Sequence, residues 1–128
     1  MTDKIIERKL RILAASDIHG DSSQFKKLAE RAEREKIDLV VLCGDVTSPL
    51  QGSNIIKPFK EKSKKVLLVP GNHDGLVVAD FLSRLYNIRN LHGDYAVYYN
   101  VGFFGCGLAN VGLDALSERD FYETLKNG

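Results

Sequence analysis

The chain has 128 residues, the length of one ordinary domain, and its 44% hydrophobic and 27% charged residues exclude disorder as the main state. Its 18 basic and 17 acidic side chains give a net charge of +1, which does not indicate nucleic-acid binding. No apolar run approaches the roughly 18 residues of a membrane span, and the apolar stretch after the charged N-terminus is too short for a signal peptide. We therefore expect a globular protein that does not enter the membrane.

The first residues, 1–10, form a charged N-terminal extension, and one domain is predicted over residues 11–128. Three runs of mostly apolar residues have the length of buried strands; they are residues 11–16, 38–43 and 65–69. The second run is apolar at nearly every position, which is typical of a parallel strand that is covered on both faces.

Helices are predicted after each of these strands. The first begins at Ser22 or Ser23, which can cap it, and has apolar residues at helical spacing. A short helix is expected over residues 54–63, and another begins near Asp74. Strands that alternate with helices predict βαβ units and a mostly parallel sheet.

The pattern changes in the last third of the chain. Short strands are predicted over residues 91–99 and 102–108, and together they are expected to form an antiparallel hairpin. A final helix is expected to begin at Ser117. This part of the chain does not continue the βαβ pattern.

Polar side chains follow each of the three predicted parallel strands. Asp17 and His19 follow the first strand, Asp45 follows the second, and Asn72 and His73 follow the third. The intervals between these groups are about one βα unit each, so all of them are predicted to lie at the carboxyl edge of the sheet. Because Asp17 and His19 are two residues apart, an extended strand end would point both side chains the same way.

This mixture of oxygen and nitrogen donors suits a hard or borderline divalent cation. Asp45, on the middle turn, is placed to bridge two ions, and two ions about 3.5–4 Å apart can generate a hydroxide nucleophile and hold a phosphoryl group. Gly44 and Gly71 permit tight turns that bring the following side chains inward. His92 lies beside a glycine near the expected hairpin, which is typical of an ordinary polar histidine at the surface or in a turn.

The two cysteines, Cys43 and Cys106, both lie inside apolar runs. We therefore expect two small buried side chains, with neither a disulfide nor a reactive thiol. Unpaired cysteines are typical of a reducing compartment, which predicts a cytoplasmic location.

The segments SDIHG at 16–20, GD at 44–45 and GNHD at 71–74 resemble the motifs of the calcineurin-like metallophosphoesterases, and the resemblance extends over about residues 11–107. It implies an α/β fold, the αββα sandwich of that family, with a centre that holds two divalent metal ions, often Mn, Fe, Zn or Ni. Among these ions, we expect manganese to support the activity.

The resemblance also implies a role for each residue of the centre. Asp17 and His19 would hold the first metal, Asp45 would bridge, and Asn72 would bind the second metal and approach the phosphate. His73 would be catalytic near the leaving group, as a general acid or charge stabiliser. Asn72 would therefore serve both as a metal ligand and as a catalytic residue.

The sequence departs from the family pattern in three ways. Its first nine residues extend beyond a typical start of the family's domain. Ser48 stands where many members have a second aspartate, in the motif G-D-x-x-D. The family also has a later lone histidine and a G-H-x-H motif, whereas the histidines here are His19, His73 and His92. We therefore expect an incomplete sandwich, made of the N-terminal βαβ units and a terminal hairpin and lacking the C-terminal part of the domain.

The expected function is a metal-dependent phosphoesterase that hydrolyses a phosphorylated small molecule or a phosphodiester by means of a hydroxide that bridges the two metals. Two alternatives stay open: a non-catalytic half-domain that serves as a binding or assembly module, and an enzyme completed by another polypeptide. An incomplete sandwich leaves apolar sheet surface uncovered, so a homo-oligomer is expected.

Overall fold

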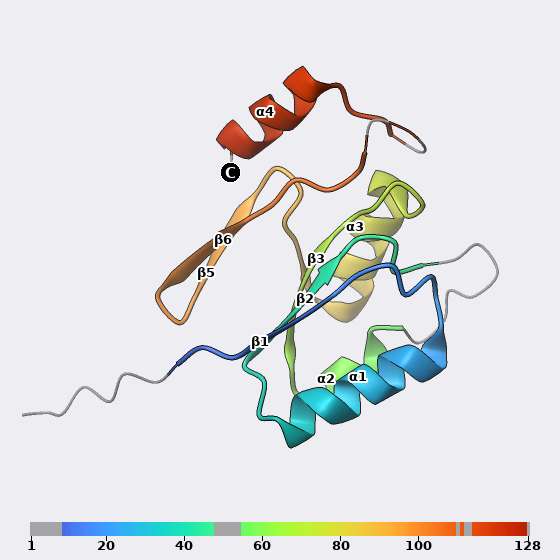
Figure 1. Cartoon of the computed structure of the whole chain (residues 1–128), viewed down its shortest axis with the longest axis vertical. Helices are drawn as coiled ribbons and strands as arrows, with labels where there is room; N and C mark the ends of the chain where they lie inside the picture. The colour runs from blue at the N-terminus through green and yellow to red at the C-terminus, as the bar shows by residue number, and fades with distance from the viewer. Residues whose placement is uncertain (1–8, 48–54, 110, 112–113, 128) are drawn as a thin grey trace, which may run out of the picture.

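A computed structural model describes residues 9–47, 55–109, 111 and 114–127 (Figure 1). The helices are α1 (Ser22–Arg34), α2 (Lys57–Glu61), α3 (Gly75–Tyr86) and α4 (Glu118–Asn127). The strands are β1 (Ile12–Ala15), β2 (Leu39–Cys43), β3 (Lys65–Val69), β4 (Arg89–Asn90), β5 (Tyr95–Tyr98) and β6 (Val101–Phe104). Ser48 and Asn54, where two features were predicted, lie outside the described residues.

Strands β1 to β4 form one parallel sheet in the order β1-β2-β3-β4, which confirms the predicted βαβ organisation. Strand β4 was not predicted, because Arg89 and Asn90 are polar and no apolar run marks them. Pairing with the edge of β3 defines this strand, and the backbone N–H of Leu91 continues the pairing by donating to the oxygen of Leu68 at 2.8 Å.

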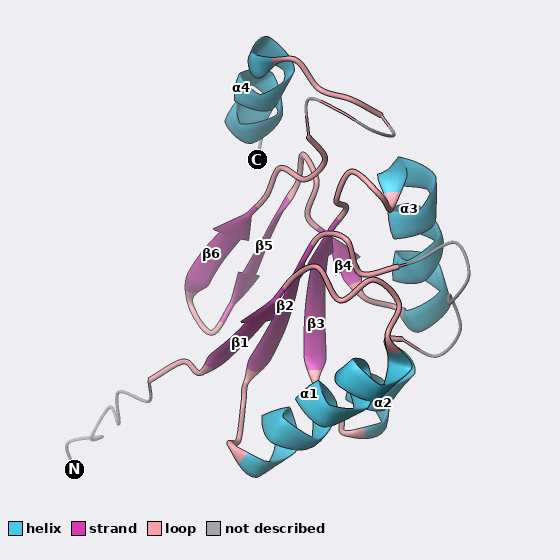
Figure 2. Cartoon of the chain, turned by 45° about the vertical axis from the view of Figure 1, so that its right-hand side comes forward, coloured by secondary structure: helices cyan, strands magenta, loops and turns pink. Residues whose placement is uncertain are grey.

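The two faces of the sheet are covered by different elements, and Figure 2 shows the sheet between the helices on one side and the β5–β6 hairpin on the other. Side chains such as Val40 and Leu68 pack in one cluster with Phe25 of α1. Side chains of the alternate positions, such as Leu39 and Leu67, pack with Ala96 of the hairpin. Burial on both faces explains why these strands are apolar at successive positions.

Two helix starts differ from the predictions. Asp21, rather than Ser22 or Ser23, caps α1, because its Oδ1 accepts hydrogen bonds from the backbone N–H groups of Ser23 (3.0 Å) and Gln24 (3.3 Å). Helix α2 covers only Lys57–Glu61 of the expected 54–63, with a proline in its first turn, where the missing N–H is tolerated.

The predicted hairpin is present, with shorter strands than expected. Tyr95 pairs with Phe104 across it, and a two-residue turn at Tyr99 and Asn100 joins the strands. Both turn residues have positive φ, 53° and 64°, which is the geometry that matches the twist of a tight hairpin. The outward side of the hairpin is apolar and exposed at Val97 and Phe104, among others.

The fold is therefore an α/β arrangement of one helical layer, a parallel sheet and the hairpin as a second β layer. Helix α4 contributes no buried residue to the core. None of the helices in the described part of the chain is long and apolar enough to cross a membrane.

Phe59 anchors α2 in the core, where its ring is fully buried and meets Phe25 edge-on at 6.2 Å between centroids. Phe59→Ala should therefore lower the free energy of unfolding by about 3–5 kcal/mol, measured by urea denaturation. Phe81→Ala is the matched control, because this ring on α3 is 59% exposed and its loss should cost less than about 0.5 kcal/mol. Similar losses for the two variants would contradict this description of the core.

Candidate metal centre

The loops that follow β1 and β2 run side by side at the carboxyl edge of the sheet. Three backbone hydrogen bonds join them: Asp17 N–H to Gly44 O at 3.1 Å, His19 N–H to Asp45 O at 2.9 Å, and Gly20 N–H to Val46 O at 2.8 Å. The pairing of the two strands thus continues into the loops, which fixes Asp17 and His19 relative to Asp45.

Three residues predicted to be metal ligands have left-handed backbone conformations. The φ angles are 57° at Asp17, 51° at His19 and 50° at Asp45. The expectation that an extended strand end brings Asp17 and His19 together is therefore wrong, although the two side chains do meet. The left-handed region costs a residue with a Cβ roughly 1–2 kcal/mol, and such strain is concentrated at functional sites.

Gly44 and Gly71 are required for different reasons. Gly44 has φ of +86°, and a Cβ there would lie 2.9 Å from the Cα of Gly71. A Cβ on Gly71 would instead overlap the carboxylate of Asp45. The two turns therefore approach each other closely: the Gly71 backbone takes the space at Gly44, and Asp45 takes the space at Gly71.

The structure brings Asp17, His19 and Asp45 together. Each offers one ligand atom, and these atoms lie within 4.8 Å of one another. The Nε2 atom of His19 is 3.8 Å from Oδ1 of Asp17. Asp17 and His19 are exposed and Asp45 is partly buried, so the three donors face an open edge of the sheet.

Asn72 and His73 adjoin this cluster through Asp45. The backbone N–H of His73 donates to Oδ1 of Asp45 at 3.0 Å, and the ring Nδ1 is 3.3 Å from Oδ2. The His73 ring also meets the His19 ring edge-on, at 5.3 Å between centroids. The side-chain amide of Asn72, with its nitrogen toward Asp45, lies 3.3 and 3.1 Å from the two carboxylate oxygens.

The environment of Asp45 favours its charged form. Partial burial opposes ionisation, but hydrogen bonds from the backbone and ring of His73, and the charges of His73 and His19, outweigh it. The pKa of the Asp45 carboxyl therefore lies below its usual value, so this residue is an anionic donor at neutral pH.

Asp74 is a buried residue of the site for which no role was predicted from the sequence. Its side chain is 2% exposed and accepts hydrogen bonds from the backbone N–H groups of Val46 (3.3 Å), Thr47 (2.9 Å) and Gly71 (2.9 Å), and from the Thr47 hydroxyl (2.5 Å). It precedes α3 but makes no capping hydrogen bond to that helix. The aspartate thus ties the loop after β2 to the loop after β3.

His92 has a structural role at the base of the hairpin. It is partly buried, its Nδ1 accepts a hydrogen bond from the backbone N–H of Gly107 at 3.0 Å, and burial lowers the pKa of its imidazole. The neutral ring is the form that can accept this bond. His92 does not belong to the group of Asp17, His19 and Asp45.

A cavity of about 480 Å³ adjoins Asp45 and Asn72 between the sheet and the hairpin. Both cysteines line it and both are free, as predicted. The prediction that both are buried is wrong, because Cys43 is exposed and Cys106 only partly buried where they border this opening. Surrounding protein groups limit hydration of the two thiols and raise their pKa, so they favour the neutral form.

Residues 10–123 match the sequence profile of the family described as calcineurin-like phosphoesterase. The chain belongs to the calcineurin-like phosphoesterase family. This match confirms the family resemblance that the three motifs indicated. Members of this family are metal-dependent hydrolases of phosphoesters.

The chain is similar to two other proteins. It is 31% identical over 103 residues to the uncharacterized protein MJ1162 of Methanocaldococcus jannaschii, covering 79% of this chain and 44% of that protein. Its fold is similar to the crystal structure of TT1561 of Thermus thermophilus, with a TM-score of 0.65, 23% identity, and coverage of 81% of this chain and 52% of that one. The chain thus spans about half the length of both proteins.

The donors in this chain fit a divalent metal. Carboxylate, imidazole and amide groups converge, and Asp45 is ionised among them. The Asn72 amide also fits a metal site. If its oxygen turns toward Asp45, the amide oxygen and the carboxylate face each other as two acceptors, and a shared cation stabilises such an arrangement.

Asp74→Ala should lower the free energy of unfolding by about 2–3 kcal/mol, because it leaves buried backbone N–H groups of both loops without an acceptor. Urea denaturation measures the change. Asp80→Ala is the control, since this exposed carboxylate forms an ion pair with Arg84 one helical turn away and its loss should cost less than about 1 kcal/mol. Equal effects would contradict the role of Asp74 as a link between the loops.

Proposed function

We propose that this chain carries the metal-binding half of a phosphoesterase centre that hydrolyses phosphomonoesters or phosphodiesters. The observation that supports the proposal is the convergence of the Asp17, His19 and Asp45 donor atoms within 4.8 Å, on the family's motifs. Asp17 and His19 would hold the first ion, Asp45 would be shared by both, and Asn72 would hold the second. When bound, the ions polarise the phosphoryl group and activate the attacking water.

His73 has the geometry of a proton donor in this proposal. Oδ2 of Asp45 lies 3.3 Å from Nδ1 of His73, which orients the ring, and the His73 side chain is 61% exposed. Its Nε2 is thus available to donate a proton to the leaving oxygen of the substrate, while the neighbouring carboxylate stabilises the imidazolium. Asn72, beside it, approaches the same phosphate.

The cavity beside Asp45 and Asn72 provides room for the organic part of the substrate. Its walls include apolar side chains such as Val69 and Phe103, and two of the four predicted ligands, Asp45 and Asn72, also line it. This arrangement supports a phosphorylated small molecule or a small phosphodiester, with the phosphate at the rim and the organic group over the apolar wall.

Location and assembly belong to the same proposal. Two free thiols support a cytoplasmic location. The exposed apolar side of the hairpin, at Val97 and Phe104, supports a homo-oligomer that covers it.

Calorimetric titration with Mn²⁺ tests the proposed centre. We expect one tight ion for each chain, because three of the proposed ligands belong to the first position and two, Asp45 and Asn72, belong to the second. Hydrolysis of bis-p-nitrophenyl phosphate by this chain should be slow. Absence of Mn²⁺ binding would refute the proposal, and two tight ions would show that a further donor, such as His92 or a second copy, completes the centre.

Asp45→Ala should lower the Mn²⁺ affinity at least about tenfold, because the change removes an anionic donor from the shared position. Asp80→Ala removes an equally charged carboxylate from α3, outside the cluster, and should leave the affinity within about twofold. If both variants bind Mn²⁺ as the parent protein does, Asp45 is not a ligand.

The two histidines of the cluster should differ. His19→Ala should weaken Mn²⁺ binding by about tenfold or more, whereas His73→Ala should retain the ion and lower any measured turnover by about 10²–10⁴-fold. Titration and hydrolysis assays on the same two variants separate the roles. Loss of the ion with His73→Ala would make His73 a ligand rather than a proton donor.

A further inference from the structure

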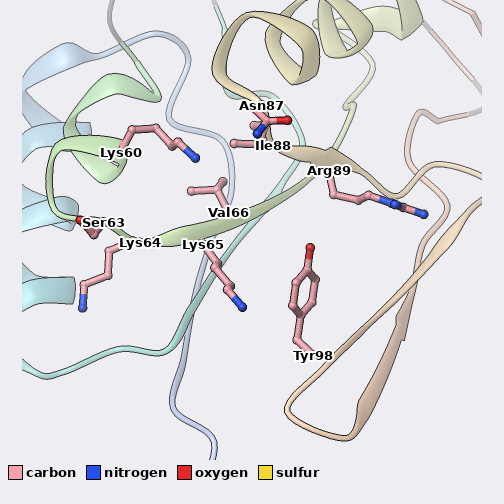
Figure 3. Close-up of a pocket in the computed structure, with 9 residues that line it drawn as sticks. All are labelled: Lys60, Ser63, Lys64, Lys65, Val66, Asn87, Ile88, Arg89 and Tyr98. Atoms are coloured by element: carbon pink, nitrogen blue, oxygen red, sulfur yellow. The ribbon is translucent and has the colours of Figure 1, made fainter.

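A second cavity lies at the amino edge of the parallel sheet, away from the metal centre, and Figure 3 shows the side chains that line it. It lies between the end of α2, the start of β3, the turn into β4 and the hairpin. Its volume is about 390 Å³, within the size range of small-molecule sites. The proposed hydrolysis makes no use of this cavity.

The lining of this cavity is basic. Four of its side chains are cationic, namely Lys60, Lys64, Lys65 and Arg89, and none of the described residues that line it is an aspartate or glutamate. The whole chain has a net charge of only +1, so this concentration of positive charge is local. A concave site of one sign attracts ligands of the opposite sign.

Two of the four cations are already engaged. Arg89 contacts the Asp94 carboxylate at 3.0 Å and donates to the oxygen of Tyr95 at 2.9 Å, and Figure 3 shows its guanidinium turned toward the hairpin. Lys64 donates to the oxygen of Ile37 at 3.0 Å. These two side chains hold the walls of the cavity in place.

The other two lysines are available to a ligand. Within the described ranges, neither Lys60 nor Lys65 forms an ion pair with a carboxylate. The Nζ of Lys65 lies 5.1 and 5.2 Å from the ring centroids of Tyr98 and Tyr99, which restrict its position. In Figure 3 the Lys60 ammonium extends toward Val66, and the Tyr98 hydroxyl points toward the strand that carries Arg89.

We propose that this cavity binds the diphosphate group of a small molecule, either free pyrophosphate or the phosphate tail of a nucleoside diphosphate. Lys60 on α2 and Lys65 beside the hairpin border the cavity from opposite sides of β3, so an elongated anion with charged oxygens at both ends suits them better than a single carboxylate does. The apolar side chains of Val66 and Ile88 line the same cavity and leave room for a less polar part of the ligand. The inference goes beyond the proposed function and does not depend on it.

Calorimetry on the whole chain, at low salt and with EDTA to keep the metal centre empty of ions, tests the proposal. The probes are pyrophosphate, ADP and adenosine. We expect pyrophosphate and ADP to bind and adenosine not to bind, because the phosphate oxygens provide the contacts. Equal affinities of pyrophosphate and ADP would show that the diphosphate alone suffices, and an ADP affinity more than about tenfold higher would identify a nucleotide.

Lys60→Gln and Lys65→Gln should each raise the Kd for pyrophosphate about tenfold, since each removes one charge-assisted contact. Lys27→Gln is the matched control, because this exposed lysine of α1 lies outside the cavity and should change the Kd less than about twofold. Urea midpoints confirm that all three variants are folded. An equal rise in the Kd for pyrophosphate with Lys27→Gln would overturn the proposal, because it would show that the anion is attracted by the overall positive charge and not by this cavity.

Backbone amide chemical shifts locate the bound pyrophosphate. Shifts over residues 60–66 and 87–89 support the proposal, whereas shifts confined to residues 17–19 and 72–73 place the anion at the metal centre and overturn it. Absence of pyrophosphate binding also overturns the proposal. This holds even if the cavity binds an acidic peptide instead. The Mn²⁺ titration is a separate measurement, so failure of the metal centre does not decide this site.

Discussion

The buried carboxylate of Asp74 is the interaction on which the carboxyl edge of the sheet depends. Its oxygens accept hydrogen bonds from Val46 and Thr47 on one loop, 28 and 27 residues earlier in the chain, and from Gly71 on the next loop. The two oxygens of an aspartate side chain together offer enough lone pairs to accept all of these bonds. The position of Asp45, between the two loops, follows from this link and from the close approach of Gly44 and Gly71.

The convergence of the site could be predicted from the sequence because it follows from topology. Apolar runs over β1, β2 and β3 indicated parallel strands, and the carboxyl ends of parallel strands share one edge. Membership of the family then follows from the motifs at those ends.

Features that depend on distant partners could not be predicted in this way. Asp74 looks like an ordinary residue at a helix start, because nothing near it in the chain reveals the donors that it binds. Strand β4 is defined by pairing with β3 rather than by its own polar residues. The left-handed conformations of Asp17 and His19 likewise depend on backbone bonds to the neighbouring loop. The predicted cap of α1 was wrong by one residue. Asp21 and Ser22 are adjacent, and both aspartate and serine cap helices well, so the sequence alone does not distinguish them.

The two edges of the sheet carry opposite charge. Aspartates gather at the carboxyl edge, at Asp17 and Asp45, and lysines gather at the amino edge, at Lys60 and Lys65. Strand β3 joins them, since Lys65 begins it and the Gly71 turn follows it. A chain whose net charge is close to zero therefore presents two local fields of different sign, one suited to cations and the other to anions.

The backbone bonds between the loops after β1 and β2 also affect how the centre moves. Loop amides usually exchange their hydrogens with water quickly, because local opening costs little. Here the amides of Asp17, His19 and Gly20 are donors to the neighbouring loop. We expect them to exchange as slowly as amides within the strands, so that this edge opens only when β1 separates from β2. The centre would then be held ready for its ligands by the same cooperative unit that forms the sheet.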